Sequence, residues 1–130
     1  MEKLRVISII DDDASVRQAT ARLVRSLGYR AEVYASAEEY LQSGHIRDSS
    51  CLITDLHMPG MSGADLQDRL TAQGYRIPIV FMTAYFEDRT RARVMEAGAY
   101  GFLRKPFDDA SLIKHLEMAL KEPDPENGKP

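Results

Sequence analysis

Five side chains of this 130-residue chain combine groups that can attack, bind or neutralise a charged substrate. A carboxylate can act as a nucleophile or a metal ligand, a hydroxyl can donate a hydrogen bond, and an ammonium supplies positive charge. All five lie at or just beyond the end of a short apolar run. These residues are Asp11, Asp12, Asp55, Thr83 and Lys105.

Three carboxylates gathered at one site would repel one another. Two unit charges 4 Å apart cost about 4 kcal/mol at an effective dielectric constant of 20. Either one carboxyl is protonated, or a cation binds. We favour Mg²⁺, which prefers one or two carboxylates, several waters and a phosphate oxygen over a full protein cage. Three aspartates, one Mg²⁺ and Lys105 give a nominal charge of zero, which suits an incoming phosphoryl group.

Apolar runs rich in β-branched residues alternate with amphipathic stretches along the chain, which predicts strands alternating with helices. Asp13 is a candidate N-cap and Gly28 a candidate residue after the helix end, while the S-x-x-E spacing from Ser36 predicts a capping box. Asp108 or Asp109 is expected to cap the last helix. We expect strands over 6–10, 31–34, 51–54, 79–82 and 100–103, and helices over 14–27, 36–44, 64–73, 87–97 and 109–121.

Five strand–helix units with short connections predict an α/β fold, with a parallel sheet covered by helices on both faces. The crossovers between parallel strands are right-handed. All strands then point the same way, and their carboxyl ends share one edge, where ligands bind in such sheets. The topology therefore predicts that the five polar side chains converge.

Composition narrows the class of protein. The chain has 17 Lys and Arg against 20 Asp and Glu, a net charge of −3, so we expect no nucleic-acid surface. A hydrophobic content of 44% predicts one folded domain, over residues 1–121, and excludes disordered and collagen-like classes. A single cysteine excludes an internal disulfide. No run approaches the ~18 apolar residues of a membrane span, and no signal peptide is evident. We expect a cytoplasmic protein, with residues 122–130 forming a tail or the start of a linker.

Each polar residue alone has an ordinary explanation. Asp13 fits a helix cap best, and Asp11 alone could be a cap as readily as a functional carboxylate. Lys105 alone would be a surface lysine, and Thr83 a strand-end hydroxyl. Five such residues at one edge of the sheet are poorly explained by five unrelated ordinary roles.

Four motifs together resemble the receiver domain of bacterial two-component response regulators. They are IDDD at 10–13, TDLHMPGMSG at 54–63, MTA at 82–84 and LRKPF at 103–107, and the similarity covers residues 4 to 121. The resemblance implies a flavodoxin-like, doubly wound (βα)5 fold with a five-stranded parallel sheet in the order 2-1-3-4-5. Residues 36–41 and 104–109 are similar to the nitrogen-fixation, FixJ-like branch, whose members carry a helix-turn-helix output domain.

The same resemblance assigns roles at the acidic cluster. Asp55 matches the phosphoacceptor, which takes a phosphoryl group from a sensor histidine kinase or a phosphotransfer protein. Asp12 matches a direct Mg²⁺ ligand, and Asp11 matches an acid that acts through water. His57 matches the position whose backbone carbonyl binds the metal. Its side chain fits an exposed loop group slightly better than a chemical role.

Three further positions match the switch that responds to phosphorylation. Thr83 matches the hydroxyl that binds the phosphoryl group, Lys105 matches the lysine that pairs with Asp55, and Phe102 matches the aromatic switch residue. The Lys105–Pro106 bond is cis in this family. His57 and Tyr85 occupy variable positions that tune the rate of phosphoryl loss, in a direction that the sequence does not predict.

These assignments predict a signalling domain whose only turnover is its own phosphorylation and dephosphorylation. Three alternatives stay open: a receiver that works without phosphorylation, a small phosphatase with an aspartyl nucleophile, and a flavin-binding module. Such phosphatases need an acid two residues after the nucleophile, where this chain has His57, and three acids after the first strand would repel a flavin phosphate. A homodimer that forms on phosphorylation is a hypothesis from the resemblance.

Overall fold

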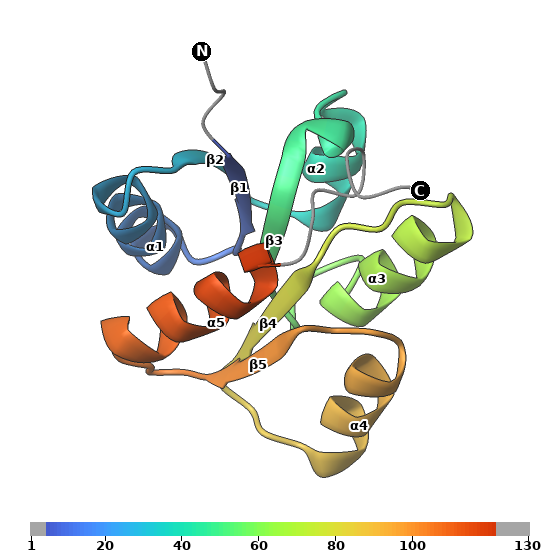
Figure 1. Cartoon of the computed structure of the whole chain (residues 1–130). Helices are drawn as coiled ribbons and strands as arrows, with labels where there is room; N and C mark the ends of the chain where they lie inside the picture. Colours follow the sequence, from blue (N-terminus) through green and yellow to red (C-terminus); the bar gives the residue numbers. More distant parts are fainter. Residues whose placement is uncertain (1–4, 122–130) are drawn as a thin grey trace.

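The computed structural model describes residues 5–121, which form one five-stranded parallel sheet between two layers of helices (Figure 1). The strand order is β2-β1-β3-β4-β5, as the resemblance implied. The expected tail over 122–130 lies outside the described residues. The elements are β1 (Val6–Ile10), α1 (Ala14–Ser26), β2 (Arg30–Tyr34), α2 (Ala37–Gln42), a 3₁₀ turn η1 (Ile46–Asp48), β3 (Ser49–Asp55), α3 (Gly63–Ala72), β4 (Ile79–Thr83), α4 (Asp88–Glu96), β5 (Gly101–Arg104) and α5 (Asp109–Lys121).

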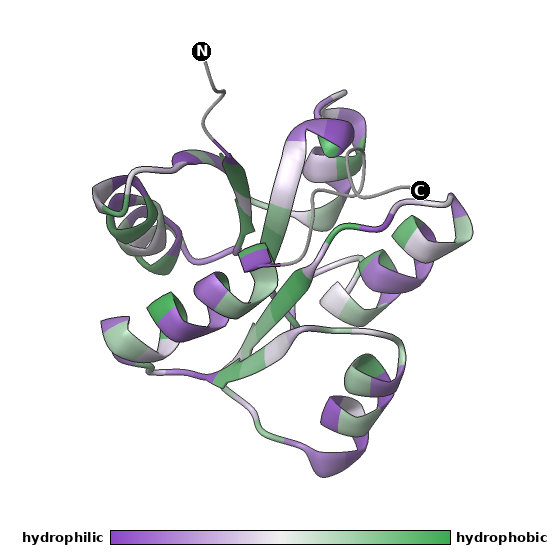
Figure 2. Ribbon diagram, viewed as in Figure 1, coloured by the Kyte–Doolittle hydropathy of each residue, from purple (hydrophilic) through white to green (hydrophobic). Residues whose placement is uncertain are grey.

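The sheet separates two apolar cores. Successive side chains of a strand point to opposite faces, so Ile9 belongs to the core shared with α1 and α5, while Ile10 belongs to the core shared with α2, α3 and α4. Strands covered on both faces have no polar side, which is why the central strands are apolar nearly throughout (Figure 2).

Side-chain caps are present at three of the helices where they were expected, but at Ser36 only one of the two bonds of the predicted capping box is formed. The side chain of Asp13 accepts hydrogen bonds from the backbone of α1, and that of Ser36 accepts one from Glu39 N. At α5, the carboxylate of Asp108 accepts a hydrogen bond from Ser111 N at 2.8 Å, so Asp108 is the capping residue of the two candidates. These local signals set where the helices begin.

The segment before β3 differs from the prediction. The chain makes the turn η1, which was not predicted, and β3 begins at Ser49, two residues before the expected start at Cys51. Ser49 lies outside the predicted strand, but its hydroxyl is buried and lies 2.7 Å from both Ser8 Oγ and Tyr40 Oη. This hydroxyl cluster (Ser8, Tyr40 and Ser49) joins β1, α2 and β3.

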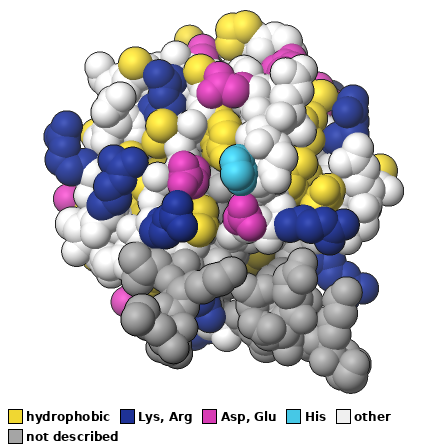
Figure 3. All heavy atoms as spheres, turned by 90° about the horizontal axis from the view of Figure 1, so that it is seen from above, with side chains coloured by type: hydrophobic (Ala, Val, Ile, Leu, Met, Phe, Trp, Pro, Cys, Tyr) yellow, Lys and Arg dark blue, Asp and Glu magenta, His cyan; other side chains and the backbone are white. Residues whose placement is uncertain are grey.

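Within residues 5–121, none of the helices combines the length and the apolar character needed to cross a membrane. Viewed at the amino ends of the strands, the visible surface intersperses cationic and acidic side chains (Figure 3). The functional side chains expected from the sequence belong to the opposite edge.

Candidate functional site

The register of the sheet brings the predicted residues to one edge. Ile10, the last residue of β1, pairs with Thr54 of β3, so Asp11 and Asp55 follow at the same level. Asp55 pairs with Met82, and Thr83 pairs with Arg104 across β4 and β5. Four neighbouring strands therefore end at nearly the same level, with one of the predicted site residues at or just beyond each end.

Lys105 bridges two of the three carboxylates. Its Nζ atom donates hydrogen bonds to Asp11 Oδ2 at 2.8 Å and to Asp55 Oδ2 at 2.7 Å. Asp11 is fully buried and Asp55 is 7% exposed. Buried carboxylates need such a partner, because an unpaired charge away from water is costly. The cis Lys105–Pro106 bond expected from the resemblance is present.

Asp12 completes the acidic cluster from the solvent side. Carboxylate oxygens of Asp11, Asp12 and Asp55 lie within 4.8 Å of one another, and Asp12 is exposed. Both oxygens of Asp11 already accept hydrogen bonds, one from Asp13 N and one from Lys105. A hard oxygen donor set with one solvent-facing member fits Mg²⁺, which keeps several waters.

Burial and pairing shift the protonation of this cluster. Desolvation is the main influence on Asp11 and raises its pKa above the ordinary value. Burial alone would lower the pKa of Lys105, but its bonds to the two carboxylates outweigh burial and hold that pKa above the ordinary value. Lys105 therefore carries its charge throughout the neutral range.

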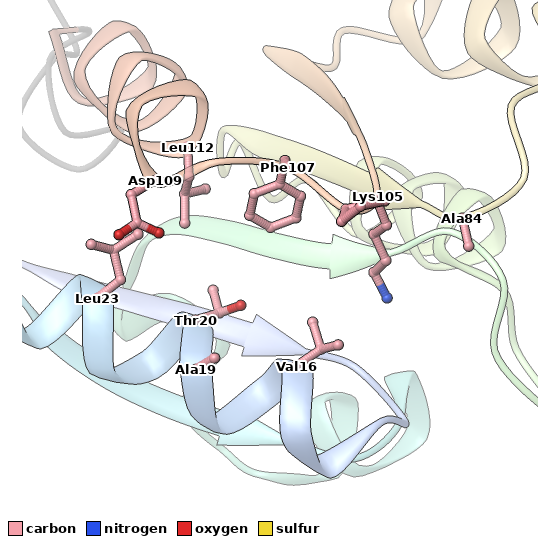
Figure 4. Close-up of a pocket in the computed structure, with 10 residues that line it drawn as sticks. Val16, Ala19, Thr20, Leu23, Ala84, Lys105, Phe107, Asp109 and Leu112 are labelled. Atoms are coloured by element: carbon pink, nitrogen blue, oxygen red, sulfur yellow. The ribbon is translucent and has the colours of Figure 1, made fainter.

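An apolar cavity of about 350 Å³ lies beside Lys105, between α1 and the start of α5. Figure 4 shows Val16 and Leu23 of α1 on one side, Phe107 and Leu112 on the other, and Lys105 near one end. Lys105 is one of the residues that line this cavity, and its partial burial there is the influence that alone would lower its pKa.

The loop that follows Asp55, residues 56–62, is closed by short backbone contacts. His57 N donates to Asp55 Oδ1 at 3.1 Å, and Gly63 N donates to Leu56 O at 2.9 Å. A Cβ atom on Gly63 would lie 2.6 Å from Asp55 O, closer than real Cβ contacts come. Glycine at this position therefore lets α3 begin directly against the end of β3.

Thr83 is buried at the end of β4, but its hydroxyl is engaged with its own loop. Thr83 Oγ1 donates to Tyr85 O at 2.9 Å and accepts from Tyr85 N at 3.0 Å. The Tyr85 ring is 72% exposed and meets the His57 ring edge-on, with centroids 5.9 Å apart. This ring pair joins the loops that follow β3 and β4.

Phe102, the predicted switch aromatic, is half-buried on β5 and packs edge-on against Phe86, with centroids 5.9 Å apart. The Arg104 guanidinium lies 5.5 Å from the centre of the Phe86 ring. The predicted aromatic position thus borders the loop between β4 and α4.

Sequence reasoning missed two side chains that hold the loops of the site. Arg17 Nη1 donates to Asp11 O at 2.7 Å, and Glu38 Oε2 accepts from Met61 N at 2.9 Å. Arg17 lies one helical turn beyond its loop and could have been suspected from spacing. Glu38 is 23 residues from its partner, and no local pattern marks that contact.

A family model, described as the response regulator receiver domain, matches residues 7–117. The chain belongs to this family. Receiver domains bind Mg²⁺ at an acidic pocket, and this chain has an acidic cluster of Asp11, Asp12 and Asp55 at the corresponding edge of the sheet. The predicted fold class and family are confirmed.

Curated relatives include response regulator protein TodT of Pseudomonas putida, 38% identical over 120 residues. Transcriptional regulatory protein FixJ of Azorhizobium caulinodans is 37% identical over 114 residues. These alignments cover 92% and 88% of this chain but 53% and 54% of the two relatives. The chain therefore spans about half the length of the regulators that it matches, and the similarity to FixJ agrees with the expected branch.

Solved structures agree with this assignment. The chain superposes on the response regulator StyR with a TM-score of 0.85 at 39% identity, over 92% of this chain and 60% of that one. It superposes on FixJ-N with a TM-score of 0.81 at 32% identity, over 93% of this chain and 96% of that one. The match to FixJ-N covers nearly all of both chains.

Proposed function

We propose that Asp55 is the phosphoacceptor of this receiver domain and takes its phosphoryl group from a phosphohistidine on a sensor histidine kinase or phosphotransfer protein. The observation that carries the proposal is the bridge of Lys105 between Asp11 and Asp55, with Asp12 beside them. One ammonium leaves three carboxylates only partly neutralised. The remaining negative charge is what a divalent cation would offset.

The bond changes are simple. An oxygen of Asp55 forms a bond to phosphorus, the phosphorus–nitrogen bond of the donor breaks, and the imidazole leaves. Such transfers depend on alignment and on neutralising the phosphoryl oxygens, more than on covalent chemistry by the protein. Bound Mg²⁺ would supply part of that charge, held by Asp12, Asp55 and the carbonyl of His57, with Asp11 acting through water. Lys105, already 2.7 Å from Asp55 Oδ2, supplies the rest.

Phosphorylation would change the bonding of Thr83. The modified Asp55 carries a charge of about −2 in place of −1 and adds acceptor oxygens. The Thr83 hydroxyl now donates to Tyr85 O, and donating to a phosphoryl oxygen requires it to give up that bond. The loop between β4 and α4 would move, and Phe102, which packs against Phe86 of that loop, would move with it. The surface of α4, β5 and α5 would then report the change.

The partners follow from the family. A kinase or phosphotransfer protein would be the donor, and a second copy of the domain or an output domain would read the altered surface. The similarity to FixJ suggests that the output is transcription. We propose a cytoplasmic location on the same grounds, no nucleic-acid contact by this domain, and no activity beyond its own phosphorylation and dephosphorylation.

Phosphorylation with acetyl phosphate tests the proposal. We expect intact-mass spectrometry to detect one phosphoryl group on the wild type in Mg²⁺, and none in EDTA or on the Asp55→Asn variant. The exposed Asp48→Asn variant is the matched control and should be phosphorylated like the wild type. Uptake by Asp55→Asn at the wild-type rate, or no uptake by the wild type, would contradict the proposal.

Beryllofluoride, which mimics a phosphoryl group, supplies an independent readout. With Mg²⁺, it should shift the amide NMR signals of Thr83, Tyr85 and Phe102. An unchanged spectrum at these residues would favour a receiver that works without phosphorylation.

A further inference from the structure

The loop of residues 56–62 is held from outside by one side chain of α2. Glu38 is half-buried, and its Oε2 atom accepts a hydrogen bond from Met61 N at 2.9 Å. This bond lowers the pKa of Glu38 below its ordinary value, because the amide favours the charged carboxylate. Glu38 therefore meets the loop as an anion, and charge-assisted hydrogen bonds are the stronger kind.

Gly60 is shaped around the same carboxylate. Its φ of +78° is one that side chains rarely adopt, and a Cβ atom there would lie 2.5 Å from Glu38 Oε2. The loop backbone thus approaches Glu38 at two successive residues, Gly60 and Met61. The hydrogen bond from Met61 N holds the loop at this point, and the glycine beside it leaves room for the carboxylate.

The helix that carries Glu38 is itself firmly placed. Ala37 and Tyr40, on either side of Glu38, are fully buried. The Tyr40 hydroxyl lies 2.7 Å from Ser49 Oγ in the hydroxyl cluster, which ties α2 to β3. Because α2 is held in place by these buried residues, the carboxylate of Glu38 has a well-defined position beside the loop.

The loop so held begins next to the phosphoacceptor. Its two ends are joined by the bond from Gly63 N to Leu56 O, and His57 N lies 3.1 Å from Asp55 Oδ1. A loop joined at its ends and held at Met61 has little freedom to move His57. The carbonyl of His57 is the group that the proposed function places on Mg²⁺.

We propose that Glu38 is a positioning residue for phosphoryl transfer: it holds the loop of residues 56–62 so that the carbonyl of His57 faces the metal site. This inference rests on the proposed function. Groups that orient a metal ligand typically change metal affinity about 10- to 100-fold when removed. Glu38 is half-exposed and acts through the backbone, so we expect the lower end, about tenfold.

The metal-free protein supplies a test that needs no activity. Amide hydrogen exchange of Met61 should be about tenfold faster in Glu38→Ala than in the wild type, since the amide loses a charged acceptor. Glu38→Gln keeps an acceptor oxygen and should restore most of the protection. The matched control is Glu39→Ala, which removes an exposed carboxylate from the same first turn of α2 and should leave Met61 unchanged.

The link to the site is tested by titrating each variant with Mg²⁺ alone, followed by amide NMR. Glu38→Ala should bind Mg²⁺ about tenfold more weakly and be phosphorylated more slowly at subsaturating Mg²⁺, with the rate recovered at saturation. Faster exchange at Met61 with unchanged Mg²⁺ affinity would overturn the positioning role. If the wild type itself is not phosphorylated, the proposed function fails first, and the exchange data still report whether Glu38 holds the loop.

A double-mutant cycle with Gly60→Ala checks the contact itself. Gly60→Ala should destabilise the wild type more than it destabilises Glu38→Ala, because the second background lacks the carboxylate that the new methyl group would meet. Additive losses of stability would mean that Glu38 and the loop are not coupled, and would overturn the inference.

Discussion

The two loops beside Asp55 differ in how the fold holds them. Residues 56–62 are tied to α2 through Glu38, to Asp55 through His57 N, and across their ends by Gly63. The loop between β4 and α4 has the Thr83–Tyr85 bonds, which are internal to it, and exposes the rings of Tyr85 and Phe86. The first loop is therefore tied by hydrogen bonds to neighbouring parts of the fold, whereas the hydrogen bonds of Thr83 with Tyr85 hold the second loop only to itself.

The two ends of helix α4 also differ in how they are held to the rest of the fold. Its N-cap, Glu87, makes no side-chain bond to the backbone of the first turn, and its carboxylate has only a long 3.4 Å bond from the exposed Thr90 hydroxyl. Toward its other end, Val94 is buried and its carbonyl accepts a hydrogen bond from Gln67 Nε2 at 3.0 Å. A change at Thr83 would therefore be absorbed by the start of α4 and resisted at Val94.

Removal of Lys105, which contacts Asp55 at the start of the first loop, should produce the largest loss of folding stability. Lys105→Met leaves Asp11 and Asp55 facing each other in a buried site, and breaking such a pair costs about 3 kcal/mol. Urea denaturation in EDTA measures the loss, and added Mg²⁺ should recover part of it. The exposed Lys114→Met variant on α5 is the control.

The sign of the pH dependence of this effect is fixed by the raised pKa of Lys105. Its stabilisation is fully present below 10.5, the ordinary value, and is lost as the pH rises through the raised pKa. The contribution of the Lys105 charge to wild-type stability should therefore stay constant across neutral pH, and the wild type should remain more stable than Lys105→Met there. A difference that vanishes near pH 7 would contradict the bridge.

A methyl group at Gly63 is the next test. Gly63→Ala places a Cβ atom 2.6 Å from Asp55 O and 3.1 Å from a buried ring atom of Phe81, and such overpacking costs about 2 kcal/mol. Tyr85→Ala, in the other loop, should change the unfolding free energy by less than about 0.5 kcal/mol. Equal losses would remove the contrast between the two loops.

The anchoring of α4 gives a smaller effect. Gln67→Met removes a buried hydrogen bond to Val94 O and should cost about 1 kcal/mol. Arg93→Ala removes ion pairs with Asp65 and Asp68 whose side chains are more than half exposed, and should cost less than about 0.5 kcal/mol. Urea denaturation of the two variants shows which contact stabilises the protein more. A larger loss for Arg93→Ala would mean that the exposed ion pairs, and not the buried Gln67–Val94 bond, hold α4 in place.

The smallest expected effect is the contribution of Glu38 to the loss of stability at acidic pH. Because its pKa is lowered, Glu38 contributes stability that is present above about 4.5, the ordinary value, and is lost as the pH falls through the lowered pKa. Glu38→Gln has no such group, so its thermal stability should decline less steeply on acidification through this range. Identical slopes would mean that the bond to Met61 contributes nothing in solution.

Sequence alone predicted the strands, the helices and the edge at which Asp55 lies, because these follow from apolar periodicity and the direction of parallel strands. The family motifs also marked Asp11, Asp12, Asp55 and Lys105, whose side chains meet there, whereas the Thr83 hydroxyl bonds to Tyr85. The start of β3 was missed because Ser49 is polar, and its burial depends on hydroxyl partners from Ser8 and Tyr40.

The supporting contacts could not be predicted in the same way. The capping-box spacing from Ser36 drew attention to Glu39, yet the neighbouring carboxylate of Glu38 reaches the loop near Asp55. That contact depends on how α2 is oriented over the sheet, which is a property of packing. The bonds of Thr83 to Tyr85 depend likewise on the path of a loop.

The hydroxyl cluster has a consequence for the choice among three consecutive aspartates. Ser8 and Ser49 meet only in the observed alignment of β1 with β3, and a slip of one residue would turn every side chain of β1 to the other face. Asp12 would then point toward Lys105, and Asp11 toward solvent. The Ser8–Ser49 contact thus favours, together with the apolar pattern of β1, the alignment in which Asp11 is the inner acid.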